Sequence, residues 1–346
     1  MSLIYNATFD SQTRVLSLLD KAGNVISSCE VPSKELVDDI TKPLTFRATQ
    51  DRSTLRLSRN NTGVDGDFQT SRDGGNTWAD YTIGSRITLN TGDEVSFRVK
   101  KDRSQYQYTG SYYYFEMTGK IEAWHNVMSL YRANDFATYD TAVGSLFPYL
   151  FENCTSLTKA PVLPATTLAE ACYYNMFSGC QSLTKAPELP ATTLERAFSC
   201  YSGMFKNCQS LTKAPELPAT TLAPNCYQNM FSGCQSLTKA PELHATTLAI
   251  DCYDHMFSGC QSLTEAPVLP ATTLAKNCYA SMFSGCQSLK EVRVSATTTA
   301  ENALKNWLEG VSATGDFYCN PNATIFPTND VSGIPSGWTR HDISNQ

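Results

Sequence analysis

Pairs of cysteines that lie eight residues apart recur five times in the second half of this sequence. The first pair stands in "CYYNMFSGCQSL" (172–183), with an aromatic residue and a methionine between the two thiols. Thiols in such pairs could hold a metal ion, form disulfides, act as nucleophiles or pack in a core. The cysteines of the five pairs are Cys172, Cys180, Cys200, Cys208, Cys226, Cys234, Cys252, Cys260, Cys278 and Cys286.

The spacing argues against most of this chemistry. Structural zinc sites need four ligands at short spacings, and the chain has only 4 histidines. Eight residues of helix would rise about 12 Å, too far for a disulfide within a pair. Disulfides between neighbouring repeats stay open, because stacked strands lie about 4.8 Å apart. We expect buried, reduced thiols that act as small hydrophobes, with no metal and no cofactor.

The cysteines also mark a long repeat. One column of equivalent positions falls at 154, 180, 208, 234, 260 and 286, with successive differences of 26, 28, 26, 26 and 26 residues. A fixed period in this range predicts a solenoid, in which each unit buries its apolar face on its neighbours. The proline-containing part of each unit is predicted to be extended. "CYxxMFxxC" has the three- and four-residue spacings of one helical face, so each unit is predicted to be strand, turn and short helix.

Both parts of the unit point to a known family. "FxxCxSLTxAPxLPATTL" and "CYxxMF" resemble the BspA-type leucine-rich repeats of Bacteroidales surface proteins and of phages that infect those hosts. The resemblance covers residues 148–290 and implies a curved leucine-rich-repeat solenoid with a binding or adhesive role and no reaction. Flanking segments of altered sequence are expected to cap it, with a linker and N-terminal cap at 119–147 and a C-terminal cap at 291–346.

Residues 44–118 follow another pattern. Short runs that alternate apolar and polar residues, separated by Gly, Asn and Asp, predict a small antiparallel β-sandwich. With the solenoid, this makes the expected fold class mixed α+β. "SRDGGNTW" (71–78) also resembles the Asp-box of sialidases. We interpret it as a hairpin turn in which Asp73 caps backbone N–H groups, Gly75 supplies a positive φ and Trp78 packs inward; the alternative is a carbohydrate-active enzyme.

Residues 1–43 hold two apolar runs around an Ala-Gly-Asn turn, which predict a β-hairpin that needs a neighbour to cover its apolar face. The segment resembles N-terminal segments of phage tail and head-fibre proteins, where such elements dock to the virion or trimerise. The start shows no secretory signal and no stretch approaches the roughly 18 apolar residues of a membrane span. We therefore expect release by lysis, as for phage structural proteins, or a leader that was removed.

The surface offers two sets of candidate recognition residues. The first is a strip of charged columns, which is either a partner-binding face or only a solvated one. The second is a set of variable positions between the repeated core residues. The strip comprises Lys159, Lys185, Lys213, Lys239, Glu188, Glu216 and Glu242; the variable positions are Tyr174, Asn175, Gln228, Asp254 and His255.

The whole sequence therefore predicts a non-enzymatic adhesion or recognition protein. A net charge of -6 without a basic run argues against nucleic acid and acidic membranes as partners. The expected setting is the surface of a phage virion, as a fibre or head decoration; the alternative is an adhesin at the bacterial cell surface. Expected partners are a host-surface glycan or protein, other virion proteins through the N-terminal hairpin, and further copies of the chain in a trimer.

Overall fold

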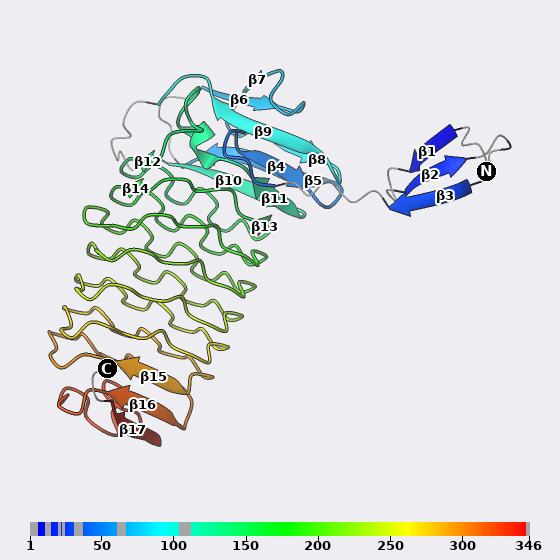
Figure 1. Ribbon diagram of the computed structural model, residues 1–346. Helices are drawn as coiled ribbons and strands as arrows, with labels where there is room; N and C mark the ends of the chain where they lie inside the picture. The colour runs from blue at the N-terminus through cyan, green and yellow to red at the C-terminus, as the bar shows by residue number, and fades with distance from the viewer. Residues whose placement is uncertain are drawn as a thin grey trace. The chain divides into compact units, whose positions relative to one another are not determined.

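The computed structural model describes residues 6–10, 15–19, 22, 25–30, 37–60, 67–103 and 112–343. It divides into two compact units, residues 1–38 and residues 39–346. The first unit holds an antiparallel sheet of β1 (Asn6–Asp10), β2 (Val15–Leu19) and β3 (Val25–Glu30), in that order (Figure 1). β2 and β3 lie in the two apolar runs of the sequence, and β1 adds a third strand. A docking or trimerising role for this unit remains a prediction.

The second unit begins with two sheets. A three-stranded sheet has the order β10-β5-β8, and a six-stranded sheet has the order β13-β11-β4-β9-β6-β7 (Figure 1). Their strands are β4 (Thr45–Ala48), β5 (Ser53–Arg59), β6 (Phe68–Ser71), β7 (Ala79–Tyr81), β8 (Ile87–Leu89), β9 (Glu94–Val99), β10 (Tyr113–Thr118), β11 (Ile121–Trp124) and β13 (Leu157–Lys159).

The core of these sheets continues into the first repeat. The ring of Phe46 on β4 lies 4.6 Å from that of Phe115 on β10, and Phe115 stacks on Phe151 of the first repeat with centroids 5.4 Å apart. β11 also pairs in parallel with β13. The segment predicted as an N-terminal cap contributes β11 and the short 3-10 helix η1 (Val127–Leu130) to this junction. The sheets therefore cover the apolar side of the first repeat, as a cap must.

Each repeat forms one rung of a solenoid. β12 (Thr141–Ala142) and β14 (Thr167–Leu168) pair in parallel, and further along pairing shrinks to single bridges such as Lys185 with Lys213. The prolines of the extended part lack the N–H that a longer ladder requires. The stack ends in a parallel sheet of β15 (Glu291–Val294), β16 (Gly315–Cys319) and β17 (Trp338–Asp342).

The short helices predicted for the repeats are wrong, and the fold is a β-solenoid rather than mixed α+β. Within the described residues, η1 is the only helical element. The "CYxxMFxxC" part of each rung, which we term the turn segment, is a series of β-turns. Its N–H groups alternate: Tyr174 N donates to Ala171 O in the same rung at 3.3 Å, whereas Tyr173 N donates to Cys200 O of the next rung at 3.0 Å.

A left-handed residue at every fourth position explains why no helix forms. Backbone φ at these positions lies between 49° and 76°, and a right-handed helix cannot run through such residues. The buried side chains accordingly repeat every four residues. Over the nine residues of "CYxxMFxxC", this period cannot be distinguished from the 3.6 residues per turn of an α-helix. Asn and Gly dominate these positions because both tolerate the left-handed region. The series is Ser145, Tyr149, Asn153, Ala171, Asn175, Gly179, Ser199, Gly203, Asn207, Asn225, Asn229, Gly233, Asp251, His255, Gly259, Asn277, Ser281, Gly285, Asn302, Asn306 and Gly310.

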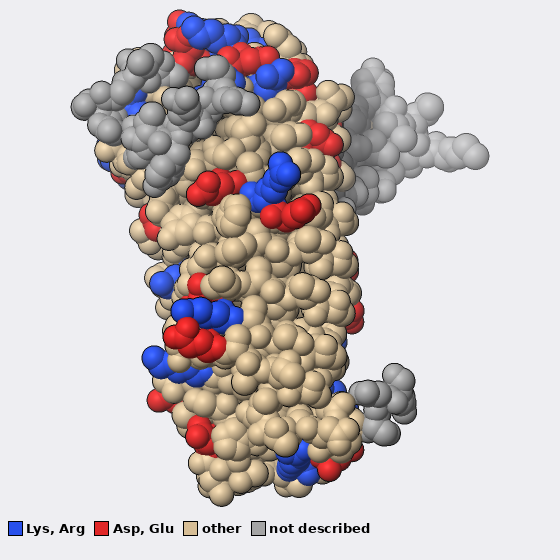
Figure 2. Space-filling view, turned by 90° about the vertical axis from the view of Figure 1, so that its left-hand side faces the viewer, with Lys and Arg blue, Asp and Glu red and all other residues tan. Residues whose placement is uncertain are grey.

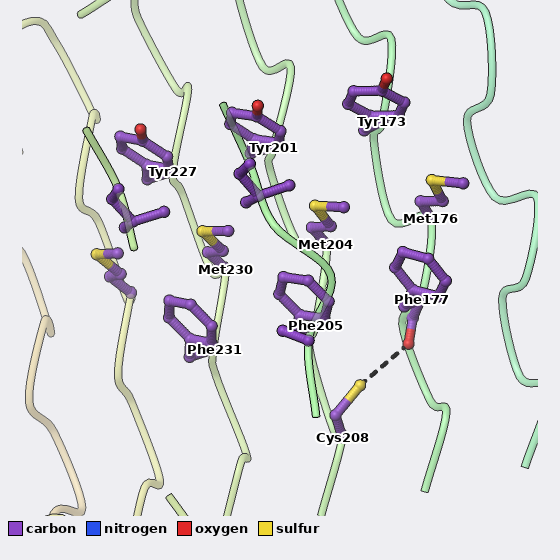
Figure 3. Close-up of a cluster of buried hydrophobic side chains, with 14 of the residues drawn as sticks. Tyr173, Met176, Phe177, Tyr201, Met204, Phe205, Cys208, Tyr227, Met230 and Phe231 are labelled. Carbon is purple, nitrogen blue, oxygen red and sulfur yellow. Dashed lines mark hydrogen bonds between the residues drawn. The ribbon is translucent and has the colours of Figure 1, made fainter. Parts of the chain in front are cut away.

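Equivalent side chains of successive rungs stack in the core. Phe177 and Phe205 have ring centroids 5.6 Å apart and nearly parallel planes, and Tyr201 and Tyr227 repeat this at 5.7 Å (Figure 3). A methionine lies between the tyrosine and phenylalanine columns, and all of these side chains are buried. Each rung therefore covers the aromatic face of its neighbour, which is the burial that holds a solenoid together.

The left-handed positions give a test of the turn segment. Asn277 has φ 52°, so we expect Asn277→Val to lower the stability by about 1–2 kcal/mol, because a β-branched residue is strained there. Asn277→Gly is the matched control and should lie within about half a kcal/mol of the unmodified protein. Thermal melting followed by circular dichroism measures both. Equal melting temperatures for the two variants would contradict the left-handed turn.

Candidate recognition site

The repeated cysteines are core residues rather than reactive ones. The twelve cysteines from Cys154 to Cys319 are all buried and free. In one column the thiol has a defined role: Cys208 Sγ donates to Phe177 O of the preceding rung at 3.1 Å (Figure 3), and its column mates do the same. Burial raises the pKa of Cys172 and of Cys208 to about 12. Neither thiol is therefore a nucleophile at neutral pH, since the thiolate is the reactive form.

The Asp-box is a self-contained hairpin between β6 and β7. Asp73 Oδ1 accepts hydrogen bonds from Ser71 Oγ at 2.7 Å and Thr77 N at 2.9 Å, and its Oδ2 accepts from Thr77 Oγ1 at 2.6 Å. These bonds hold the pKa of Asp73 far below its usual range. Gly75 has φ 95°, as predicted. Trp78 differs from the expectation that it packs inward, because it is half-buried with the guanidinium of Arg98 4.1 Å above its ring.

The charged strip lies on the extended half of the rungs. Lys185, Lys213 and Lys239 are exposed, as are Glu188, Glu216 and Glu242, and no ion pair joins the two columns within the described residues. Lys159 departs from its column, because its Nζ lies 3.7 Å from the centroid of the Trp124 ring. The strip is thus a regular row of solvated charges.

A third surface is the edge of the solenoid that carries β12 and β14. Pairs of exposed threonines follow this edge from rung to rung, beginning with Thr166 and Thr167. Thr298 Oγ1, for example, donates to Thr273 Oγ1 of the preceding rung at 3.1 Å. Figure 2 faces this edge and shows only scattered charged side chains over the rungs. The edge is polar but nearly uncharged.

The turn segments carry a sizeable hollow. It is open, encloses about 280 Å³, and is lined almost entirely by polar groups. Tyr174, Asn175 and Gln228, three of the predicted variable positions, line it. Ser202 and Gly203 form its floor, because small residues there replace the larger side chains of the rungs on either side. The other lining residues are Glu152, Ser178, Lys206, Asn207 and Asn229.

The remaining two predicted variable positions continue from this hollow along the stack. Gln228 Nε2 donates to Asp254 Oδ2 at 2.9 Å, and His255 Nδ1 lies 2.6 Å from Asp254 Oδ1. The hydrogen bond to this carboxylate raises the pKa of His255 despite partial burial. All five positions thus belong to one surface, the outer side of the turn segments, which we term the turn face.

Several lining residues were not predicted, although the sequence carries a signal for them. In four rungs the two residues before the second cysteine of the pair are Ser-Gly, whereas the rung of Cys200 and Cys208 has Lys206 and Asn207. Gly203 is explained by its neighbour, since a Cβ there would lie 1.9 Å from Asn175 Oδ1. A comparison of each rung with the others, rather than a search for motifs, would have found the hollow.

Comparison with known families identifies the repeats. Residues 198–307 match the BspA type leucine rich repeat region, in six copies. No curated protein and no solved structure matched the chain. None of the helices in the described part of the chain is long and apolar enough to cross a membrane, and no group of His, Cys, Asp and Glu there is arranged to hold a metal ion.

The environment of the cysteines gives a prediction for thiol titration. In native protein the thiols should react slowly with a disulfide reagent, because they are buried and their pKa values are raised. After denaturation without a reductant, titration should report nearly all 13 cysteines as free. Each disulfide between rungs would remove two thiols from that count, so a large shortfall would contradict the reduced core.

Proposed function

We propose that this chain, a BspA-type leucine-rich repeat protein, is a non-enzymatic recognition protein whose turn face binds a partner at a surface. The observation that carries the proposal is that the departures from the repeat gather around one hollow. The rung of Cys200 and Cys208 belongs to the only unit of 28 residues, and it places Gly203, Lys206 and Asn207 in the lining. Its core residues Tyr201, Met204 and Phe205 keep their types.

This separation of constant and changed positions supports binding over simple stacking. A rung that only had to pack on its neighbours has no need for a lysine where four others carry serine. The changed side chains face solvent, and they meet changed side chains of adjacent rungs such as Tyr174 and Gln228. Extended solenoid surfaces commonly serve partner binding, because stability resides in the core and the outside is free to vary.

The chemistry of the other candidate sites agrees with a non-enzymatic role. Both oxygens of Asp73 are engaged in holding the hairpin, so the carboxyl is a poor proton donor or nucleophile. The core thiols are protonated at neutral pH because burial raises the pKa of each; for Cys226 it is raised to about 12. These observations support recognition over the carbohydrate-active enzyme that the Asp-box suggests.

For the setting, we propose the surface of a phage virion. The N-terminal unit docks to other virion proteins there or joins three copies of the chain in a trimer. The support is the resemblance of residues 1–43 to phage fibre segments. The alternative is the bacterial cell surface, where BspA-type repeat proteins are generally found. Both settings display the turn face to an outside partner.

Mass spectrometry of purified particles separates the two settings. We expect peptides of this chain in purified virions and their depletion from outer membranes of the producing cells. A major structural protein of the same virion serves as the positive control for recovery. Enrichment in outer membranes and absence from virions would contradict the virion placement and leave the recognition function standing at the cell surface.

Binding to intact Bacteroidales cells tests which face acts. We expect Lys206→Ser, which restores the residue of four other rungs, to reduce binding of the labelled full chain several-fold in flow cytometry. Lys185→Glu combined with Lys213→Glu tests the charged strip. Binding that falls only in the strip variant would contradict the turn face, and cells that bind no protein at all would contradict the recognition function. Melting temperatures check that each variant is folded.

A further inference from the structure

We propose that the hollow on the turn face, together with a row of tyrosines beside it, binds a neutral glycan. The inference rests on the proposed recognition function and adds the chemical class of the partner. It follows from four features of the site: which donors and acceptors remain available, the size of the hollow, the aromatic surface next to it and the balance of charge.

The backbone at the floor of the hollow is already fully engaged. Asn175 N donates to Ser202 O at 2.9 Å, Gly203 N to Gln228 O at 2.8 Å and Asn207 N to Ser232 O at 2.7 Å. A peptide recognised as an added strand needs free backbone groups along an edge, and none are offered here. Recognition is therefore left to side-chain amides and hydroxyls, each of which pairs well with a ligand group that both donates and accepts, as sugar hydroxyls do.

The dimensions suit a small polar unit. The hollow of about 280 Å³ lies near the lower end of the ~300–1,000 Å³ typical of small-molecule sites. It is open to solvent, and Ser202 and Gly203 line it where the neighbouring rungs carry Tyr174 and Gln228. One or two sugar rings of a longer chain fill such a space, with the rest of the chain continuing over the surface.

A row of aromatic rings gives the rest of that chain a surface. Tyr174 lies 5.4 Å from Tyr149, Tyr149 lies 4.5 Å from Tyr112, and Tyr112 lies 6.1 Å from Tyr114, as distances between ring centroids. All four side chains are half-buried, so part of each ring faces solvent. The C–H face of a sugar ring packs on such rings, and tyrosine brings a large rigid contact surface at low cost in conformational entropy.

Charge favours a neutral partner. The lining contains one carboxylate, Glu152, and one ammonium group, Lys206, and Asp254 with His255 lies just beyond Gln228. Burial raises the pKa of Glu152, which already disfavours its ionised form. An acidic sugar would meet Glu152 and Asp254 against a single lysine, and a basic peptide would meet Lys206. Neither sign of charge is matched, so uncharged hydroxyl-rich chains fit best.

The test uses the labelled full chain on intact Bacteroidales cells. Periodate, which cleaves vicinal diols, should abolish binding, whereas proteinase K treatment of the cells should leave it intact. Raising the salt concentration should change the apparent affinity by less than about two-fold, since screening acts on charged partners. Isolated neutral polysaccharide from the same cells should compete.

Two variants at one position of the repeat link this binding to the hollow. Ser202→Tyr fills the hollow and should weaken binding about ten-fold or more, and Ala280→Tyr, the equivalent position three rungs away, should leave it unchanged. Tyr174→Ala should also weaken binding, through the aromatic row. Similar melting temperatures for Ser202→Tyr and Ala280→Tyr show that any loss is local.

The outcomes separate the two proposals. Binding that survives periodate and is lost with proteinase K identifies a protein partner, which overturns the glycan inference and keeps the recognition function. Strong salt dependence with competition only by acidic polysaccharide overturns the neutral class. Equal binding by Ser202→Tyr and the unmodified chain overturns the hollow as the site. Absence of cell binding by the unmodified chain overturns the recognition function itself.

Discussion

The structure depends on how the turn segments share their backbone hydrogen bonds. Alternate N–H groups bond within the rung and to the next rung, as Tyr174 N and Tyr173 N do. The backbone N–H groups of the segment thereby find partners without a helix and without a long strand. The pattern requires four residues for each turn and a left-handed residue in each, so a rung cannot gain or lose a residue here. The two extra residues of the 28-residue unit accordingly lie before the first cysteine of its pair.

The four-residue turns also determine which side chains form the core. Each turn directs two adjacent residues inward, and the rung spacing brings equivalent side chains into face-to-face stacks such as Phe177 on Phe205. Cysteine suits the column of Cys208 for two reasons. Its side chain is small enough for the end of the turn segment, and its thiol donates to a phenylalanine carbonyl of the preceding rung. These thiols are therefore packing groups with one weak hydrogen bond each, and their repetition reflects the geometry of the rung.

Recognition is separated from stability in this design. The two outward residues of each turn make few demands on the fold beyond the left-handed backbone at one of them, so the turn face can vary from rung to rung. Where it varies most, around Ser202 and Lys206, the surface is hollowed and polar. The charged strip on the extended half varies less and stays regular, which is the behaviour of a solvated face.

The sequence by itself determined the rung length, the buried residues of each repeat and the family of the repeats, because periodicity records which positions face a common core. It also pointed to Tyr174, Asn175 and Gln228 as variable positions. Only the tertiary structure decided that the turn segments are not helical, since periods of 3.6 and 4 coincide over nine residues. The tertiary structure alone placed Glu152 and Lys206 in one hollow. A contact between rungs joins residues about one repeat or more apart in the sequence, and no local sequence pattern records which outward side chains meet across that distance.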